Sequence, residues 1–148
     1  MVLKEYPILN TYIEAVRKTR RDDADLATIF LVGAVSELTV REIMDDEQIG
    51  AERLIIKALD EGKISVEEEA LFQAIRERRN KYVHINAQRI LDDYQYFTVG
   101  RDGLLDNINE IALADFSEKA LAKVLTLHIK EDAAQIFSDF EKLVSLLE

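Results

Sequence analysis

Turn-forming residues are scarce in this chain, which contains only five glycines and one proline among 148 residues. A sandwich or barrel of many short strands needs frequent turns, and glycine and proline supply most of them. Hydrophobic residues make up 48% of the chain and charged residues 32%, a balance that favours a folded globular protein over a disordered one. We therefore predict an all-α protein, an antiparallel bundle of about five to seven helices that forms one domain over residues 1–148.

Apolar residues recur at helical spacing along most of the chain, with capping residues between the runs. Ser65 and Glu68 have the spacing of a capping box, which predicts a helix start. Gly62, just before them, is the residue type expected directly after a helix end. The predicted helices run over residues 7–21, 24–44, 51–61, 65–83 and 86–97, followed by a loop at 100–103 and a helical region that opens at Ser117.

Two acidic residues fall within apolar helical patterns. Glu37 lies in the middle of the 24–44 helix, which is apolar nearly all round and should be the central, most buried element. Arg41 follows one turn later, in the orientation that favours an ion pair with Glu37. Asp132 falls on the apolar face of the C-terminal region, so we expect a break there rather than one helix of about 30 residues.

Several classes of protein are excluded by what the chain lacks. No window approaches the ~18 uninterrupted apolar residues of a membrane span, and no apolar stretch typical of a secretion signal follows the first residues. The absence of cysteine excludes disulfides, thiol nucleophiles and Cys-ligated metals. His84 and His128 are the only histidines, too few for a three-histidine metal site. We predict a cytoplasmic protein with no metal and no cofactor, and a core or interface position for His128.

The net charge of −10 repels polyanions on average, but basic residues concentrate in two segments. Residues 1–21 contain five basic residues against two acidic ones, and residues 76–89 contain five against one. If the protein binds nucleic acid, these segments are where it would do so. A basic run on a helix can equally be a solvated face, and both interpretations remain open.

Arg79 has an unusual place on the predicted 65–83 helix. Around the helix axis, the Arg79 side chain points in the same direction as a stripe of apolar residues. The stripe comprises Leu71, Phe72, Ile75 and Tyr82. A guanidinium there must pair with a carboxylate, lie at an interface or line a wet cleft, because an unpaired buried charge costs several kcal/mol. Glu37 on the central helix is an available partner.

His84 follows Arg79 by five residues, and the two have complementary chemistry. A neutral imidazole can accept the proton of a ribose 2′-hydroxyl, and a guanidinium can hold a phosphate and stabilise its developing charge. Together they could support metal-independent transesterification of RNA. The two side chains diverge within one helix, so they would converge more easily if two copies of the helix faced each other. The alternative is a paired core arginine and a helix-terminal histidine favoured by the helix dipole.

The stretch Arg79-Asn80-Lys81-Tyr82-Val83-His84 resembles the signature of the HEPN superfamily, the higher eukaryote and prokaryote nucleotide-binding domains. That signature is an arginine, a polar residue, three further residues and a histidine. The apolar helix with its acid at Glu37 and the turn at residues 62–65 are similar to this group as well. The similarity covers roughly residues 24–97.

The resemblance implies a helical homodimer in which the motif helices of two protomers form a composite cleft. Many such domains are metal-independent endoribonucleases of toxin-antitoxin, abortive-infection or CRISPR systems. Carried over to this chain, Arg79 would bind the phosphate and His84 would transfer protons. Asn80 would orient either Arg79 or His84, and Glu37 would support Arg79. The neighbouring candidates for substrate binding are Arg76, Arg78 and Lys81.

One position departs from the family pattern. HEPN toxins paired with a minimal nucleotidyltransferase usually carry a tyrosine two residues after the histidine, where this chain has Asn86. Regulation by modification of such a tyrosine is therefore not carried over to this chain, and an antitoxin or nucleotidyltransferase stays a candidate partner. Other HEPN-like domains are silent modules that bind RNA or protein. The alternative function is thus a catalytically inactive helical module that mediates protein-protein interaction or regulation.

Overall fold

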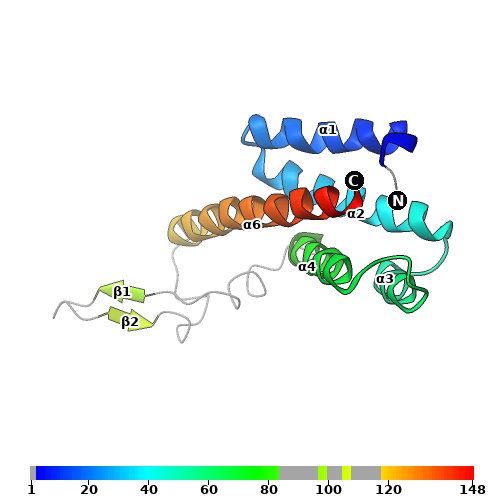
Figure 1. The fold of residues 1–148 in the computed structure, drawn as a ribbon. Coiled ribbons are helices and arrows are strands. Elements are labelled where there is room, and N and C mark those ends of the chain that lie inside the picture. The colour runs from blue at the N-terminus through cyan, green and yellow to red at the C-terminus, as the bar shows by residue number, and fades with distance from the viewer. Residues whose placement is uncertain (1–2, 84–96, 100–104, 108–117) are drawn as a thin grey trace.

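The structure is a computed structural model, which describes residues 3–83, 97–99, 105–107 and 118–148 (Figure 1). A short 3₁₀ helix, Leu3–Glu5, precedes α1. The α-helices are α1 (Pro7–Arg21), α2 (Asp25–Met44), α3 (Ala51–Asp60), α4 (Val66–Val83) and α6 (Glu118–Leu147). The strands β1 (Phe97–Val99) and β2 (Leu105–Asn107) pair antiparallel, with Thr98 opposite Asp106. The predicted all-α helical bundle is confirmed, with this small hairpin added.

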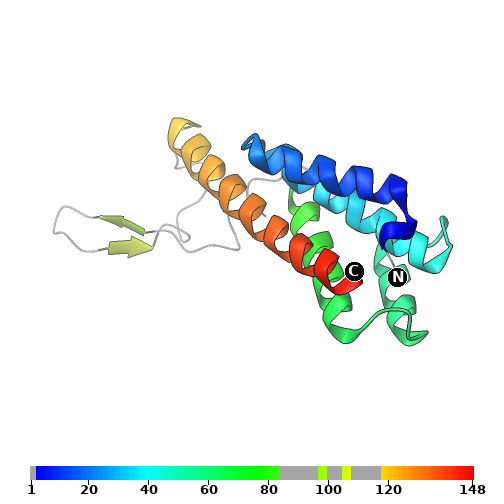
Figure 2. The same ribbon diagram turned by 45° about the horizontal axis from the view of Figure 1, so that its top comes forward.

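The long helix α2 forms the centre of the bundle. It packs against α1 on one side and against α3 and α4 on the other, and α6 packs on both α2 and α4 (Figures 1 and 2). Ile29, Val32 and Val40 of α2 are fully buried in one core shared by the described helices. The central position predicted for this helix is therefore confirmed. Two of its apolar residues nevertheless face outward, since Leu26 and Phe30 remain 46% and 43% exposed.

Local signals set most helix ends. Pro7 occupies the first turn of α1, where its missing N–H costs nothing. At the start of α4, the Glu68 N–H donates to Ser65 Oγ at 3.1 Å, and the Ser65 N–H donates to a Glu68 carboxylate oxygen at 2.8 Å. Gly62 follows α3 with a φ of +67°, a conformation that favours glycine. The predicted capping box and helix stop are both confirmed.

The predicted break at Asp132 is wrong, because α6 continues without interruption from Glu118 to Leu147. The Asp132 side chain is completely buried, and its carboxylate accepts hydrogen bonds from Arg78 Nη1 at 2.5 Å and from the Tyr82 hydroxyl. Both donors lie on α4. The buried charge is compensated by a neighbouring helix, so it does not require a bend in its own helix.

The helix predicted over residues 86–97 is corrected at its end, where Phe97 lies in strand β1. Phe97, Thr98 and Val99 are aromatic or β-branched residues, which favour strands when a partner strand is present. Residues 86–96 and the predicted loop at 100–103 lie outside the described residues. In the part of the chain that is described, no helix is both long enough and apolar enough to cross a bilayer.

Candidate functional site

The arginines of α4 reach three different neighbouring helices. The pairs are Arg76 with Glu52 of α3, Arg78 with Asp132 of α6, and Arg79 with Glu37 of α2, at 3.4, 2.5 and 3.7 Å. Positions 76 and 79 share one face of the helix, whereas position 78 points elsewhere. The structure thus brings Arg76, Arg79 and Glu37 together. It gives Arg78 a separate contact with the buried core.

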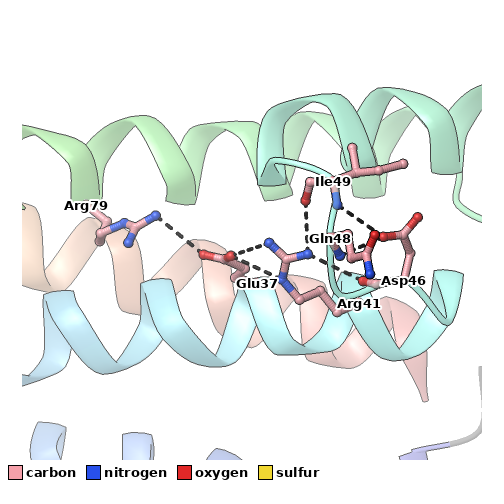
Figure 3. Close-up of polar contacts among 6 residues, drawn as sticks. All are labelled: Glu37, Arg41, Asp46, Gln48, Ile49 and Arg79. Carbon is pink, nitrogen blue, oxygen red and sulfur yellow. Dashed lines mark hydrogen bonds and ion pairs between the residues drawn. The ribbon is translucent and has the colours of Figure 1, made fainter.

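Arg79 crosses the face of α2 beside Gly33 and ends next to Glu37 (Figure 3). Its Nη2 atom lies 3.7 Å from Glu37 Oε2, a distance that allows charge attraction but exceeds a hydrogen bond. Its Nε atom is buried and has no hydrogen-bond acceptor among the described residues. The side chain keeps 24% of its surface exposed. The predicted pairing with Glu37 is confirmed, but it is a loose one.

Arg41, in contrast, holds Glu37 closely. Its Nη2 and Nε atoms donate to Glu37 Oε1 at 2.7 and 3.2 Å, as the i,i+4 spacing predicted. Its Nη1 atom donates to the backbone carbonyls of Asp46 and Ile49, at 3.3 and 3.0 Å (Figure 3). Arg41 therefore anchors the Glu37 carboxylate to the α2–α3 loop.

The α2–α3 loop is itself ordered by Asp46. The Asp46 carboxylate accepts the backbone N–H groups of Gln48 and Ile49 at 2.9 and 3.1 Å (Figure 3). These hydrogen bonds hold the pKa of Asp46 below its ordinary value. A continuous series of contacts thus runs from this loop through Arg41 and Glu37 to Arg79.

A small pocket lies between α2, α3 and α4 beside this network. Its polar lining comes from Ser36, Glu37, Arg76 and Arg79. The enclosed space is about 10 Å³, which is room for roughly one water molecule. A nucleotide does not fit into this pocket of a single protomer.

The surface next to Arg79 carries exposed apolar residues. Arg79 lies at Gly33, whereas Phe72, earlier in α4, lines the pocket with Val40, later in α2, so the two helices run antiparallel. Val83, one turn beyond Arg79 on α4, therefore extends toward the start of α2. Val83, Leu26 and Phe30 are each more than 40% exposed. We call these three residues the α2–α4 apolar patch.

The remaining motif residues lie at or beyond the end of α4. Asn80 and Lys81 are half-buried in its last turn. His84 and Asn86 lie outside the described residues. The spatial relationship of His84 to Arg79 therefore stays a prediction.

Sequence reasoning missed the polar cluster between α4 and α6. It consists of Arg78, Tyr82 and Asp132, with His128 one turn before Asp132 on α6. His128 is buried, as predicted, and burial lowers its pKa while the nearby Glu131 and Asp132 carboxylates act in the opposite direction. The available signal was Asp132 itself, since an acid on an apolar face requires a partner.

The basic segment of α1 is largely neutralised by neighbouring acids. Arg17 pairs with Glu14 and with Glu141 of α6, and these hydrogen bonds raise its pKa. Lys18 pairs with Asp22, and Arg20 pairs with Asp25. These contacts favour a role in stabilising the helix, rather than in binding nucleic acid, for this segment.

No group of three or more metal-ligating side chains is gathered among the described residues. Comparisons of the chain with protein-family models, with curated proteins and with solved structures find no match. The resemblance to HEPN domains therefore rests on the sequence pattern around Arg79 and Glu37.

Proposed function

We propose that this protein is a cytoplasmic, HEPN-like RNA-binding protein that acts as a metal-independent endoribonuclease in toxin-antitoxin or phage-defence biology. Its site would combine Arg79, Asn80 and His84 at a cleft between two identical protomers. The main observation behind the proposal concerns Arg79. This arginine lies in an apolar stripe, is partly exposed, and is held only loosely by Glu37.

Arg79 has hydrogen-bonding capacity to spare. A guanidinium carries five N–H donors, and the described carboxylate contact of Arg79 is beyond hydrogen-bond length. Glu37 is already committed to Arg41 through two hydrogen bonds. A phosphodiester offers paired acceptor oxygens that match the guanidinium fork. Binding of an RNA phosphate would therefore satisfy donors that the described residues leave unused.

The reaction follows from placing an imidazole near that phosphate. His84 accepts the proton of the ribose 2′-hydroxyl, and the 2′-oxygen forms a bond to phosphorus. The bond from phosphorus to the 5′-oxygen breaks, and the protonated His84 returns its proton to the leaving oxygen. Arg79 stabilises the negative charge on the phosphate oxygens. Asn80 orients the side chain of Arg79 or that of His84. The products are a 2′,3′-cyclic phosphate and a free 5′-hydroxyl.

A homodimer is required for this site. The pocket beside Arg79 holds about one water molecule, so a nucleotide-sized cleft needs a second protomer. The α2–α4 apolar patch borders Arg79 and offers a surface that a second copy would cover. Arg76 lies on the same face as Arg79 and could contact a neighbouring phosphate, as could Lys81.

The test is cleavage of single-stranded RNA in the presence of excess chelator. Wild-type protein and the control Arg53→Ala, at an exposed position on α3, should cleave the RNA and leave cyclic-phosphate ends. Arg79→Ala and His84→Ala should both be inactive. An inactive wild type, or equal cleavage by wild type and His84→Ala, would remove the nuclease proposal.

A second candidate is a catalytically inactive helical module that binds a protein. It is favoured by the carboxylate partners of Arg76, Arg78 and Arg79, and by the net charge of −10. This candidate predicts no RNA affinity and a stable complex recovered from cell extract. An antitoxin or a nucleotidyltransferase is the expected partner on the family resemblance, and the neighbouring genes would show whether one is encoded.

A further inference from the structure

Gly33 is an unexpected residue in the middle of α2. Glycine is the least favourable residue for a helix interior after proline, because it loses the most backbone freedom on folding. Its φ is not among the positive values of the described residues, so the backbone conformation does not require glycine here. The reason for glycine must lie in the space around it.

That space is occupied by the Arg79 side chain. A Cβ atom built on Gly33 would lie 3.0 Å from Arg79 Cβ and 3.2 Å from Arg79 Cδ, and closer still to Arg79 Cγ. The approach to Cγ is closer than Cβ atoms in proteins come to other heavy atoms, and the other two approaches are tighter than most such contacts. These atoms form the base of the arginine side chain and not its flexible end. A side chain at position 33 would force Arg79 into another rotamer or push α4 away from α2.

We propose that Gly33 is a positioning residue for the phosphate-binding arginine. The empty space at Gly33 lets the methylenes of Arg79 cross α2, and this route brings the guanidinium beside Glu37 with its unused donors available to an RNA phosphodiester. Any side chain at position 33 displaces the guanidinium from the place where the phosphate binds. The role of Gly33 in RNA binding rests on the function proposed above.

The contact can be measured without RNA, by urea denaturation of a double-mutant cycle. Gly33→Ala should lower the urea midpoint in wild-type protein. In the Arg79→Ala background the same change should lower the midpoint less, since Cγ and Cδ are gone and only the 3.0 Å approach to Cβ remains. Gly50→Ala is the matched control, because a Cβ there meets no atom within 4 Å. An equal effect of Gly33→Ala in both backgrounds would overturn the inference.

If Gly33→Ala alone does not fold, recovery of folding in the Gly33→Ala/Arg79→Ala double variant is the supporting result. Failure of both variants to fold, with Arg79→Ala itself folded, would show that the arginine side chain beyond Cβ is not the obstruction and would overturn the inference. Circular dichroism measures folding in each case.

The positioning role is measured by fluorescence anisotropy of a labelled single-stranded RNA across a salt series. Gly33→Ala should weaken binding about tenfold and reduce the salt slope by about 0.7, as expected for one lost phosphate contact on a single strand. Arg79→Ala should behave alike, and Gly50→Ala should match wild type. Wild-type affinity and slope in Gly33→Ala, with Arg79→Ala impaired, would refute the positioning role alone. No RNA binding by wild type, or equal binding by wild type and Arg79→Ala, would refute the proposed phosphate site as well.

Discussion

The Nη2 atom of Arg79 lies 3.7 Å from Oε2 of Glu37, while Arg41 binds the other oxygen of the same carboxylate at 2.7 Å. One carboxylate therefore serves two guanidinium groups unequally. Arg41 is further anchored by two backbone carbonyls of the α2–α3 loop. Within the described part of the chain, Arg79 keeps donors that no acceptor uses, and this asymmetry makes it the candidate for binding an external anion.

Glu37→Gln should lower the free energy of unfolding by about 1–2 kcal/mol, because both arginines lose their negatively charged partner in a partly buried site. Urea denaturation measures this change. Glu42→Gln is the matched control, an exposed acid on the same helix that should change stability by no more than about 0.5 kcal/mol. Equal effects of the two substitutions would show that Glu37 does not hold the arginines.

Asp132→Ala should destabilise the fold by about 3–5 kcal/mol, since it leaves the Arg78 charge and the Tyr82 hydroxyl without their buried acceptor. Asp132→Asn keeps an acceptor and should cost less. Lys130→Ala, an exposed position on the same helix, serves as the control in thermal or urea unfolding. A loss below about 1 kcal/mol for Asp132→Ala would contradict a structural role for this cluster.

His128 should make the protein less stable in mild acid. Burial lowers its pKa in the folded state below the ordinary value of 6.5, so the unfolded chain binds a proton more readily. Its contribution to stability is complete above pH 6.5 and is lost as the pH falls below that value. His128→Gln should therefore flatten the dependence of the urea midpoint on pH between about 7 and 5.

The control for this pH dependence is Leu127→Gln, an exposed neighbour that should keep the wild-type slope. An unchanged slope in His128→Gln would show that protonation of this histidine is not coupled to unfolding. The comparison uses slopes, so a uniform loss of stability in the variant does not affect it.

Phe30→Asp should convert a homodimer into a monomer, because it places a charge in the α2–α4 apolar patch. Sedimentation equilibrium gives the mass, and circular dichroism should show that the helices are retained. Ile8→Asp alters an even more exposed apolar residue on α1 and should leave the dimer intact. The same mass for wild type and Phe30→Asp would place any dimer contact elsewhere.

Features encoded within a few residues of the chain could be predicted from the sequence. The Ser65/Glu68 capping box and the Glu37–Arg41 pair each lie within one helical turn, where helix geometry alone brings the groups together. The Arg79–Glu37 pair was predictable for a different reason. A charge on an apolar stripe needs a partner, and few acids lie in apolar surroundings.

Other features that depend on how helices pack could not be predicted. Arg78 and Asp132 are 54 positions apart, and no local pattern indicates that α4 and α6 align them. Asp132 on its apolar face was interpreted as a break, although a partner helix supplies its hydrogen bonds. The reason for a glycine at position 33 is visible only in the folded structure, where the Arg79 side chain crosses α2 at that position. Phe97 likewise became a strand residue because β2 supplies the pairing that an isolated segment lacks.

The most direct test of the proposed composite site is complementation between Arg79→Ala and His84→Ala, each expected to be inactive alone. If Arg79 of one protomer works with His84 of the other, a mixed dimer retains one complete site. Equal amounts mixed under conditions that exchange subunits should then recover about a quarter of wild-type RNA cleavage. A mixture that forms mixed dimers by mass but stays inactive would contradict a site shared across the dimer.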